Sequence, residues 1–356
     1  MKIKNSKSIC WCGNSDLSVF SSEYLLCTDC KTLVLAEWPE ERNFIVEEDN
    51  KDFYGKSYWF EHQENDLQFV NILSRARTDL PERVLYWVNT LLKYKIPPGN
   101  TLELGCSHGG FVAILQWVGF QASGLELSPW VVDFARRTFQ IPMYQGKLED
   151  QKVEIGSLDA VILMDVLEHL SDPTSTISAA TALLKKDGIL ILQTPCYPEE
   201  HSFEALQKEN SPFLMMFKSP EHVYLFSQSS VQQLLNRCNL SYIQFEPAFF
   251  GMYDMFLIAS QSPLQVNSHE TIDQVLMSTA GGRLVLALLD KDAECRDLSA
   301  RLQESENDRA ARLTHMKQYD IWLKESQAEL QKLQDRLKKI KNSFIYKVAS
   351  RLGILE

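Results

Sequence analysis

The sequence predicts an α/β protein built on one doubly wound sheet of seven strands, with a cysteine-bearing module before the sheet and a coiled coil after it. Three observations lead to this prediction. From Ile96 onward, short apolar runs alternate with amphipathic stretches, as they do where parallel strands are joined by crossover helices. Four of the eight cysteines lie between residues 10 and 30. A heptad pattern runs from Leu284 to Ile340.

The composition of the chain disfavours several classes of protein. Its 356 residues, of which 45% are hydrophobic, suffice for two or three structural units. The formal net charge of -11 disfavours a nucleic-acid partner, because binding to a phosphate backbone depends on clustered Lys and Arg. No apolar run approaches the roughly 20 residues of a membrane span, and no signal-peptide core follows the first residues. We therefore expect a cytoplasmic protein with no nucleic-acid partner.

The amino-terminal cysteines form two closely spaced pairs around a β-like stretch. Tetrahedral zinc takes four thiolates from two such turns, so residues 1–40 are predicted to form a zinc-ribbon-like module with Cys10, Cys12, Cys27 and Cys30 as ligands. The first pair has one intervening residue instead of two, which strains chelation by both sulfurs. A hairpin that packs without metal is the alternative.

Seven short apolar stretches are predicted to form the strands of the sheet. They are Leu102–Gly105, Ala122–Glu126, Ile141–Tyr144, Ala160–Met164, Ile189–Gln193, Tyr242–Glu246 and Met255–Ala259. Helices are expected between most of them, which places the domain at residues 97–262.

Residues 101–111 run from a predicted strand into a turn rich in small residues and then into an apolar helix. Gly105 and Gly109 allow the backbone to approach a ligand closely, and the helix offers unpaired N–H groups at its start. About 20 residues further along, Glu126 stands at the carboxyl end of the next strand, where an acid can accept both hydroxyls of a ribose. These features predict a nucleotide-like cofactor, although a dinucleotide site would show them too.

The stretch Leu158–Pro173 separates these alternatives. It reads as a buried strand leading into Asp165, Glu168 and His169, and it resembles the fourth motif, approximately DVLEHL-x-DP, of class I S-adenosylmethionine-dependent methyltransferases. The resemblance covers roughly residues 97–260. It implies a Rossmann-like fold and S-adenosylmethionine as the cofactor. It also implies cofactor contacts from Glu103, Gly105, Cys106, Ser107, Gly109, Glu126, Leu127, Leu148 and Asp165.

Two residues depart from the pattern of these enzymes. Ser107 stands where the family usually has a second glycine, and it is either an N-cap of the next helix or a ligand contact. Lys147 stands where an acidic residue often lies near the adenine. We therefore expect the backbone N–H of Leu148 to contact the adenine.

Two histidines are candidates for chemistry. In families with this fourth motif the pair Glu168 and His169 usually begins a helix and braces the loop, so a structural role is favoured over a catalytic one. The segment around His222 resembles one that carries an active-site histidine in sugar C-methyltransferases, and this resemblance implies that His222 is the base. The alternative is that His222 packs beside Tyr224 and Phe226 and holds the loop.

The segment Phe53–Trp59, within an aromatic and helical lead-in at residues 41–96, resembles the linker between ribbon and catalytic domain in a group that includes deoxysugar methyltransferases. The resemblance implies that this segment helps cover the active site. It also implies a sugar or glycan precursor of a cell-surface polysaccharide pathway as the acceptor. Another small metabolite, of quinone or polyketide type, is the second hypothesis. A non-catalytic scaffold whose coil recruits proteins is the third.

The carboxyl-terminal part is expected to be helical. Residues 263–283 are polar and read as a linker with at most one short helix, so the catalytic core should end at residue 262. The heptads of residues 284–341 predict a coiled coil that joins chains into a parallel homo-oligomer, and one amphipathic helix folded back on the domain is the alternative. Residues 342–356 form a basic amphipathic tail, which is compatible with contact to the inner face of a membrane or with continuation of the oligomer core.

Overall fold

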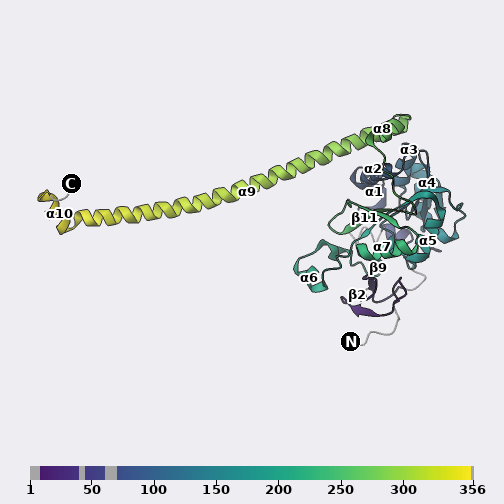
Figure 1. The fold of residues 1–356 in the computed structure, drawn as a ribbon, viewed down its shortest axis with the longest axis horizontal. Helices are drawn as coiled ribbons and strands as arrows, with labels where there is room; N and C mark the ends of the chain where they lie inside the picture. Colours follow the sequence, from purple (N-terminus) through teal and green to yellow (C-terminus); the bar gives the residue numbers. More distant parts are fainter. Residues whose placement is uncertain (1–8, 40–44, 61–69, 354–356) are drawn as a thin grey trace. The chain divides into compact units, whose positions relative to one another are not determined.

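The structure is a computed structural model that describes residues 9–39, 45–60 and 70–353. The chain divides into two compact units, Met1–Asp290 and Lys291–Glu356. The first unit holds both sheets, and the second is helical (Figure 1). Among the described helices, none has the length and hydropathy that crossing a membrane requires.

The main sheet has seven strands, as predicted. They are β4 (Asn100–Leu104), β5 (Gln121–Glu126), β6 (Met143–Gln145), β7 (Leu158–Met164), β8 (Leu184–Pro195), β10 (Tyr242–Glu246) and β11 (Asp254–Ser260). Their spatial order is β10-β11-β8-β7-β4-β5-β6. The first five strands in the chain run parallel, but β11 is antiparallel to both β8 and β10. The sheet is therefore mixed, because the short connection from β10 to β11 makes a hairpin.

Helices pack against both faces of this sheet. The helices of the first unit are α1 (Ile72–Asp79), α2 (Leu85–Tyr94), α3 (Gly110–Val118), α4 (Pro129–Phe139), α5 (Pro173–Leu183), α6 (Phe203–Lys208), α7 (Gln228–Arg237) and α8 (His269–Leu276), with shorter turns η3 (Leu80–Val84), η4 (Leu148–Asp150), η5 (Leu167–His169) and η6 (Pro212–Met216). Alternate side chains of a strand point to opposite faces. Val161 and Leu163 of β7 thus join a core with α5 and α7, while Ala160 and Ile162 join a core with α2, α3 and α8.

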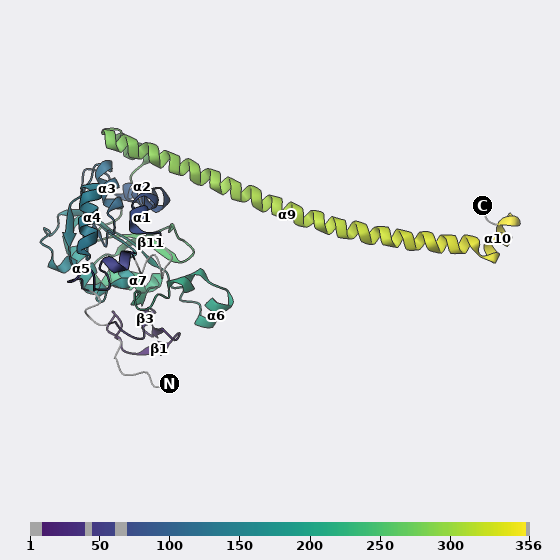
Figure 2. The same ribbon diagram turned by 180° about the vertical axis from the view of Figure 1, so that it is seen from behind.

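The amino-terminal module adds a second, smaller sheet. Its strands are β1 (Leu17–Val19), β2 (Tyr24–Cys27), β3 (Leu33–Leu35) and β9 (Tyr224–Leu225), in that order. Because β9 comes from the far side of the sequence, the module is joined to the main domain by strand pairing (Figures 1 and 2). The Tyr24 hydroxyl also donates a hydrogen bond to the His222 carbonyl oxygen at 2.8 Å.

The segment expected to be a linker is partly built into the core. Residues 263–283 contain one short helix, α8, as predicted, but its Ile272 and Leu276 are buried. The following helix, α9 (Ala280–Asn342), begins four residues earlier than expected. A Cβ on Gly281 would lie 2.6 Å from the Trp117 carbonyl oxygen, so this glycine permits close packing instead of interrupting the helix. The core therefore continues past residue 262.

The second unit consists of most of α9 and of α10 (Phe344–Arg351). Its large apolar side chains are exposed to solvent. They include Leu298, Leu302, Leu313, Met316, Tyr319, Trp322, Leu323, Leu330, Leu333, Leu337 and Ile340 on α9. Phe344 and Ile345 of α10 are exposed as well. The continuous helix agrees with the predicted one, while pairing between chains stays a prediction.

Candidate active site

The carboxyl ends of β4, β5 and β7 meet at one edge of the main sheet, where open α/β sheets bind their ligands. A cavity of about 410 Å³ opens there. Gly105, Glu126 and Asp165 line it, each at or directly after the end of its strand. Gly105 and Asp165 have φ angles of 61° and 57°, because the chain turns sharply away from the sheet at these points. Leu127 and Leu148, which were also predicted from the sequence, line the cavity as well.

The other residues predicted to contact a cofactor do not line the cavity. Gly109 has a φ of 81°, and a Cβ there would lie 2.4 Å from Ile141 Cδ1, so its close approach is to the core and not to a ligand. The buried Cys106 Sγ lies 3.7 Å from Met143 Sδ. Both residues pack inward under the loop, and their contact with a cofactor stays a prediction.

Glu103 and Ser107 lie behind the residues that line the cavity. Glu103 is buried in β4, and burial raises its pKa well above the ordinary value, with the Glu126 charge adding to the effect. The Ser107 N–H donates to Glu126 Oε2 at 3.1 Å. Ser107 is not the N-cap of α3, because Gly109 holds that position. Its backbone instead helps fix the carboxylate that faces the cavity.

Glu126 is held by two backbone donors. Besides Ser107, the Leu127 N–H donates to Glu126 Oε1 at 2.8 Å. Burial raises the pKa of this carboxyl, while the hydrogen bonds from the backbone act in the opposite direction. The carboxylate thus lies at the cavity with a fixed orientation and with further acceptor positions.

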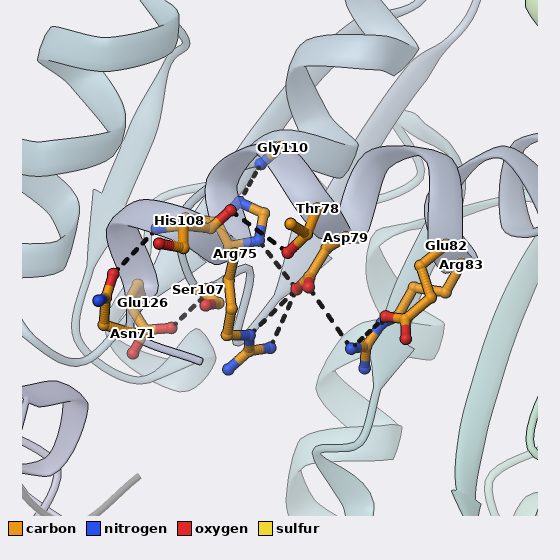
Figure 3. A network of polar contacts seen from close by, with 11 residues as sticks. Asn71, Arg75, Thr78, Asp79, Glu82, Arg83, Ser107, His108, Gly110 and Glu126 are labelled. Atoms are coloured by element: carbon orange, nitrogen blue, oxygen red, sulfur yellow. Dashed lines mark hydrogen bonds and ion pairs between the residues drawn. The ribbon is translucent and has the colours of Figure 1, made fainter. Parts of the chain in front are cut away.

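A buried histidine supports the glycine-rich turn, and sequence reasoning missed it. The Gly110 N–H donates to His108 Nδ1 at 3.0 Å, so Nε2 carries the proton and donates to Asp79 Oδ2 at 3.2 Å (Figure 3). Arg75 and Arg83 pair with the same Asp79 carboxylate. Burial lowers the pKa of His108, which favours the neutral ring that this arrangement needs. The only sequence signal was a histidine inside the turn.

Aromatic side chains close another side of the cavity. Tyr54, Tyr58 and Trp59 line it, in agreement with the predicted covering role of Phe53–Trp59. The Tyr58 hydroxyl donates to Glu221 Oε2 at 2.9 Å, and the Tyr54 hydroxyl lies 3.2 Å from His169 Nδ1. The lead-in is thus tied to two distant segments of the domain.

Residues 76–244 match the family model described as a methyltransferase domain. They form a class I methyltransferase domain. A ubiquinone biosynthesis O-methyltransferase of Xanthomonas axonopodis pv. citri (strain 306) is 32% identical over 158 residues, which cover 41% of this chain and 66% of that protein. One from Xanthomonas campestris pv. campestris (strain B100) is 31% identical over 146 residues, covering 37% and 61%. The chain thus spans somewhat less than two thirds of the length of these relatives.

Two solved structures resemble the chain at low identity. A protein of Pyrococcus horikoshii OT3 is 19% identical with a TM-score of 0.43, covering 57% of this chain and 99% of that one. The magnesium protoporphyrin IX methyltransferase of Synechocystis PCC 6803 is 17% identical with a TM-score of 0.41, covering 58% and 98%.

The cavity of the methyltransferase domain fits S-adenosylmethionine. Glu126 offers a fixed carboxylate for ribose hydroxyls, and Gly105 lines the same cavity. Among the described residues, three buried polar atoms at or next to the cavity have no hydrogen-bond partner. They are Trp59 Nε1, Glu103 Oε2 and Ser107 Oγ. Buried polar atoms are normally satisfied, so this set is typical of a site that a polar ligand completes.

The two candidate histidines lie one behind the other. His169 lines the cavity, and its Nδ1 lies 3.0 Å from the Glu221 carbonyl oxygen. His222 does not line the cavity: it is 3% exposed, and its Nδ1 lies 2.8 Å from the Met216 carbonyl oxygen. Their ring centroids are 4.8 Å apart. Burial lowers the pKa of both rings. Of the two rings, that of His169, which the sequence favoured as structural, lies at the cavity, and the role of His222 as the base stays a prediction.

The four amino-terminal cysteines converge in the structure. Their sulfur atoms all lie within 4.8 Å of one another, with 3.4 Å between those of Cys10 and Cys30 and 3.6 Å between those of Cys12 and Cys27. All four are free thiols. Tetrahedral Zn–S bonds of about 2.3 Å place sulfurs about 3.8 Å apart, so the donor set fits this metal. The single residue between Cys10 and Cys12 does not keep their sulfurs apart, because these two atoms also lie within 4.8 Å of each other.

Proposed function

We propose that the protein transfers the methyl group of S-adenosylmethionine to a hydroxyl-bearing small molecule, specifically a sugar or glycan precursor. The observation that carries this proposal is the cavity at the ends of β4, β5 and β7, with the Glu126 carboxylate on one side and an aromatic wall on the other. The aromatic segment and the cysteine module, which resemble parts of deoxysugar methyltransferases, support a sugar as the acceptor.

In this mechanism the cofactor supplies the electrophilic methyl carbon. Glu126 holds the ribose, and Tyr54, Tyr58 and Trp59 exclude water from the acceptor. Positioning supplies most of the rate in such reactions. His169 at the cavity can accept a proton, because its Nδ1–H is committed to the Glu221 carbonyl oxygen and leaves Nε2 as an acceptor.

A second candidate acceptor is a phenolic hydroxyl of a quinone precursor. The curated relatives, which are named ubiquinone biosynthesis O-methyltransferases, support it. To separate the candidates, the purified full-length protein would be incubated with S-adenosylmethionine and two panels, nucleotide sugars and catechol-type phenols. We expect a mass increase of one methyl on a nucleotide sugar. A product only among the phenols would overturn the sugar assignment, and no product in either panel would overturn the proposed function.

We also propose that Cys10, Cys12, Cys27 and Cys30 bind one structural zinc ion. The compact donor set supports this, because four converging thiols in one small module suit a closed tetrahedral site. Metal analysis of the purified protein should find about one zinc per chain. A variant with Cys27→Ser and Cys30→Ser should lose it, while Cys295→Ser, which changes an exposed cysteine, should not. Equal zinc in the double variant and the parent would contradict the proposal.

The exposed apolar side chains of α9 support a parallel homo-oligomer as the state in solution. Val285 is buried with the catalytic core, so a truncation should end after Asp290 and not before Val285. Light scattering should give an oligomer for the full-length protein and a monomer for residues 1–290. Monomers for both at micromolar concentration would refute the coiled coil.

We further propose a cytoplasmic location, with the basic amphipathic tail able to contact the inner face of a membrane. The exposed Phe344 and Ile345 beside Lys347 and Arg351 support lipid contact. Sedimentation with vesicles that contain anionic lipid should therefore depend on residues 343–356.

A further inference from the structure

Three side chains that can bind a metal converge next to the acceptor side of the cavity, away from the cysteine module. They are Glu168, His169 and His222. One ring nitrogen of each histidine and a carboxylate oxygen of Glu168 lie within 4.8 Å of one another. Glu168 and His222 are buried, and His169 reaches the cavity wall. The cluster unites the fourth-motif segment with a segment more than 50 residues further along the chain.

The protonation states of the two rings follow from their partners. His169 Nδ1 lies 3.0 Å from the Glu221 carbonyl oxygen, and His222 Nδ1 lies 2.8 Å from the Met216 carbonyl oxygen. A carbonyl oxygen only accepts, so each Nδ1 carries the proton of the neutral ring. Each Nε2 therefore presents a lone pair.

The carboxylate of Glu168 adds a third acceptor. Its Oε2 accepts a hydrogen bond from the Thr194 hydroxyl at 2.9 Å, while Oε1 lies 4.0 Å from His169 Nε2. Neutral rings in these tautomers carry no proton at Nε2, so a proton between the rings and Glu168 would have to come from this carboxyl, whose pKa burial and the Asp165 charge raise to about 8. Buried acceptors that face one another are unfavourable unless a cation or a proton lies between them.

This arrangement is the one found around metal ions. Histidines that bind a metal almost always donate their other ring N–H to a carbonyl or carboxylate, which fixes the ring and the tautomer. Two imidazoles and one carboxylate are a ligand set for divalent transition metals and leave further coordination positions open. Ligands at about 2.1 Å from a metal lie about 3 Å from one another when adjacent. The side chains would thus draw together by about 1 Å or more.

We propose that Glu168, His169 and His222 bind a divalent transition-metal ion whose open coordination position holds an acceptor hydroxyl oxygen at the cavity. The location of His169 in the wall directs that open position toward the acceptor. This inference rests on the proposed function for the identity of the oxygen ligand. In it the Nε2 lone pair of His169 binds the metal instead of accepting a proton, so the proton of the bound hydroxyl passes to another acceptor at the cavity, such as Asp165. It also gives His222 a role that its burial allows, as a ligand behind the wall.

One neighbouring charge offers a rival explanation. Burial lowers the pKa of both His169 and His222, and the positive charge of Lys218 adds to this effect. The same charge opposes the burial that raises the pKa of Glu168. If Lys218 alone balanced the carboxylate, the cluster would bind no metal. The two explanations differ in metal stoichiometry, which can be measured without any methyl transfer.

The test is a titration of the full-length, zinc-loaded protein with Mn²⁺. The electron paramagnetic resonance signal of free Mn²⁺ measures how much of the added metal stays unbound. Mn²⁺ prefers oxygen and imidazole ligands to thiolates, so the cysteine module should not compete for it. We expect one Mn²⁺ per chain in the parent. Glu168→Gln, which keeps the shape of the side chain, and His222→Ala should each weaken binding at least about tenfold. His315→Ala, which changes an exposed histidine on α9, should leave it unchanged.

Folding of each variant is checked by calorimetry of S-adenosylmethionine binding, because Glu168 and His222 lie outside the cofactor contacts described above. No Mn²⁺ binding in the parent, or equal binding in the parent and both cluster variants, overturns the metal site. Mn²⁺ binding that the variants abolish, with no methylated product in either acceptor panel, supports the site and refutes the proposed function. A product whose rate is unchanged in Glu168→Gln refutes the metal's contact with the acceptor.

Discussion

The two sides of the cavity are built in different ways. The cofactor side comes from strand ends and the turns that directly follow them, so Gly105 and Glu126 lie only about 20 residues apart in the sequence. The acceptor side joins three segments that are distant along the chain: the aromatic lead-in, the turn with Glu168 and His169, and the loop that ends at His222. Local sequence patterns can therefore specify the first side, while only the tertiary fold assembles the second.

The difference also appears in what holds each side. Backbone N–H groups orient Glu126, and the His108–Asp79 pair supports the turn from behind. On the acceptor side, contacts between side chains dominate, as between Tyr58 and Glu221. Substitutions on the first side should thus alter binding of the cofactor, and substitutions on the second side should alter binding of the acceptor.

The largest effect should come from the support of the cofactor side. Asp79→Ala leaves the buried His108 Nε2–H without its acceptor and removes one carboxylate that pairs with Arg75. We expect the free energy of unfolding to fall by about 1–3 kcal/mol, the range for an unsatisfied buried polar group. Chemical denaturation measures this. The control Asp133→Ala, which removes a 59% exposed carboxylate, should change it by less than about 0.5 kcal/mol. Equal effects of both changes would remove the special role of Asp79.

A smaller effect should follow on the acceptor side. Tyr58→Phe removes the hydroxyl that donates to Glu221 but keeps the ring in the wall. The loss of one such hydrogen bond is worth about 0.5–1.5 kcal/mol, so the acceptor KM should rise roughly 2- to 12-fold. The dissociation constant of S-adenosylmethionine should stay the same. If the cofactor constant changed and the acceptor KM did not, the division between the two sides would be wrong.

A pH dependence of stability is also expected next to the acceptor side. Burial, together with the charges of Asp165 and Glu168, raises the pKa of Asp254 to about 9. A carboxyl whose pKa is raised on folding stabilises the protein below its unfolded pKa of about 3.9, and this contribution is lost as pH rises toward 9. Asp254→Asn should therefore lose less stability than the parent between pH 5 and pH 9 in thermal unfolding. Parallel curves for the two proteins would contradict the raised pKa.

Much of the fold could be predicted, because local sequence patterns specify strands as they specify the cofactor side of the cavity. The seven strands are short apolar runs bounded by turn residues, and all seven were found near their predicted places. The antiparallel β11 and the burial of Ile272 and Leu276 were not predicted, since neither strand direction nor docking of an amphipathic helix is written in a local pattern. Residues 263–283 read as a linker, yet Gly281 allows helix α9 to pack against Trp117.

For the site, as for the fold, a residue could be predicted where a local sequence pattern marks it and not where its contacts depend on tertiary packing. Glu126, Leu127, Leu148 and Asp165 were placed in the cavity because each follows a strand or turn with a recognisable pattern. The roles of His108 and Asp79 could not be predicted, because their contact joins residues 29 positions apart through a packed helix. The order of His169 and His222 in depth depends on packing of the η6 turn, which no spacing reveals.

The central claim is that the Glu126 carboxylate binds S-adenosylmethionine on one side of the cavity, independently of the acceptor side. Calorimetric titration of the cofactor into the parent, Glu126→Ala and Tyr58→Phe tests it most directly. We predict that Glu126→Ala weakens binding by about 1–3 kcal/mol, as the loss of a charge-assisted hydrogen bond should, and that Tyr58→Phe binds the cofactor like the parent. Unchanged cofactor affinity in a folded Glu126→Ala variant would contradict the claim.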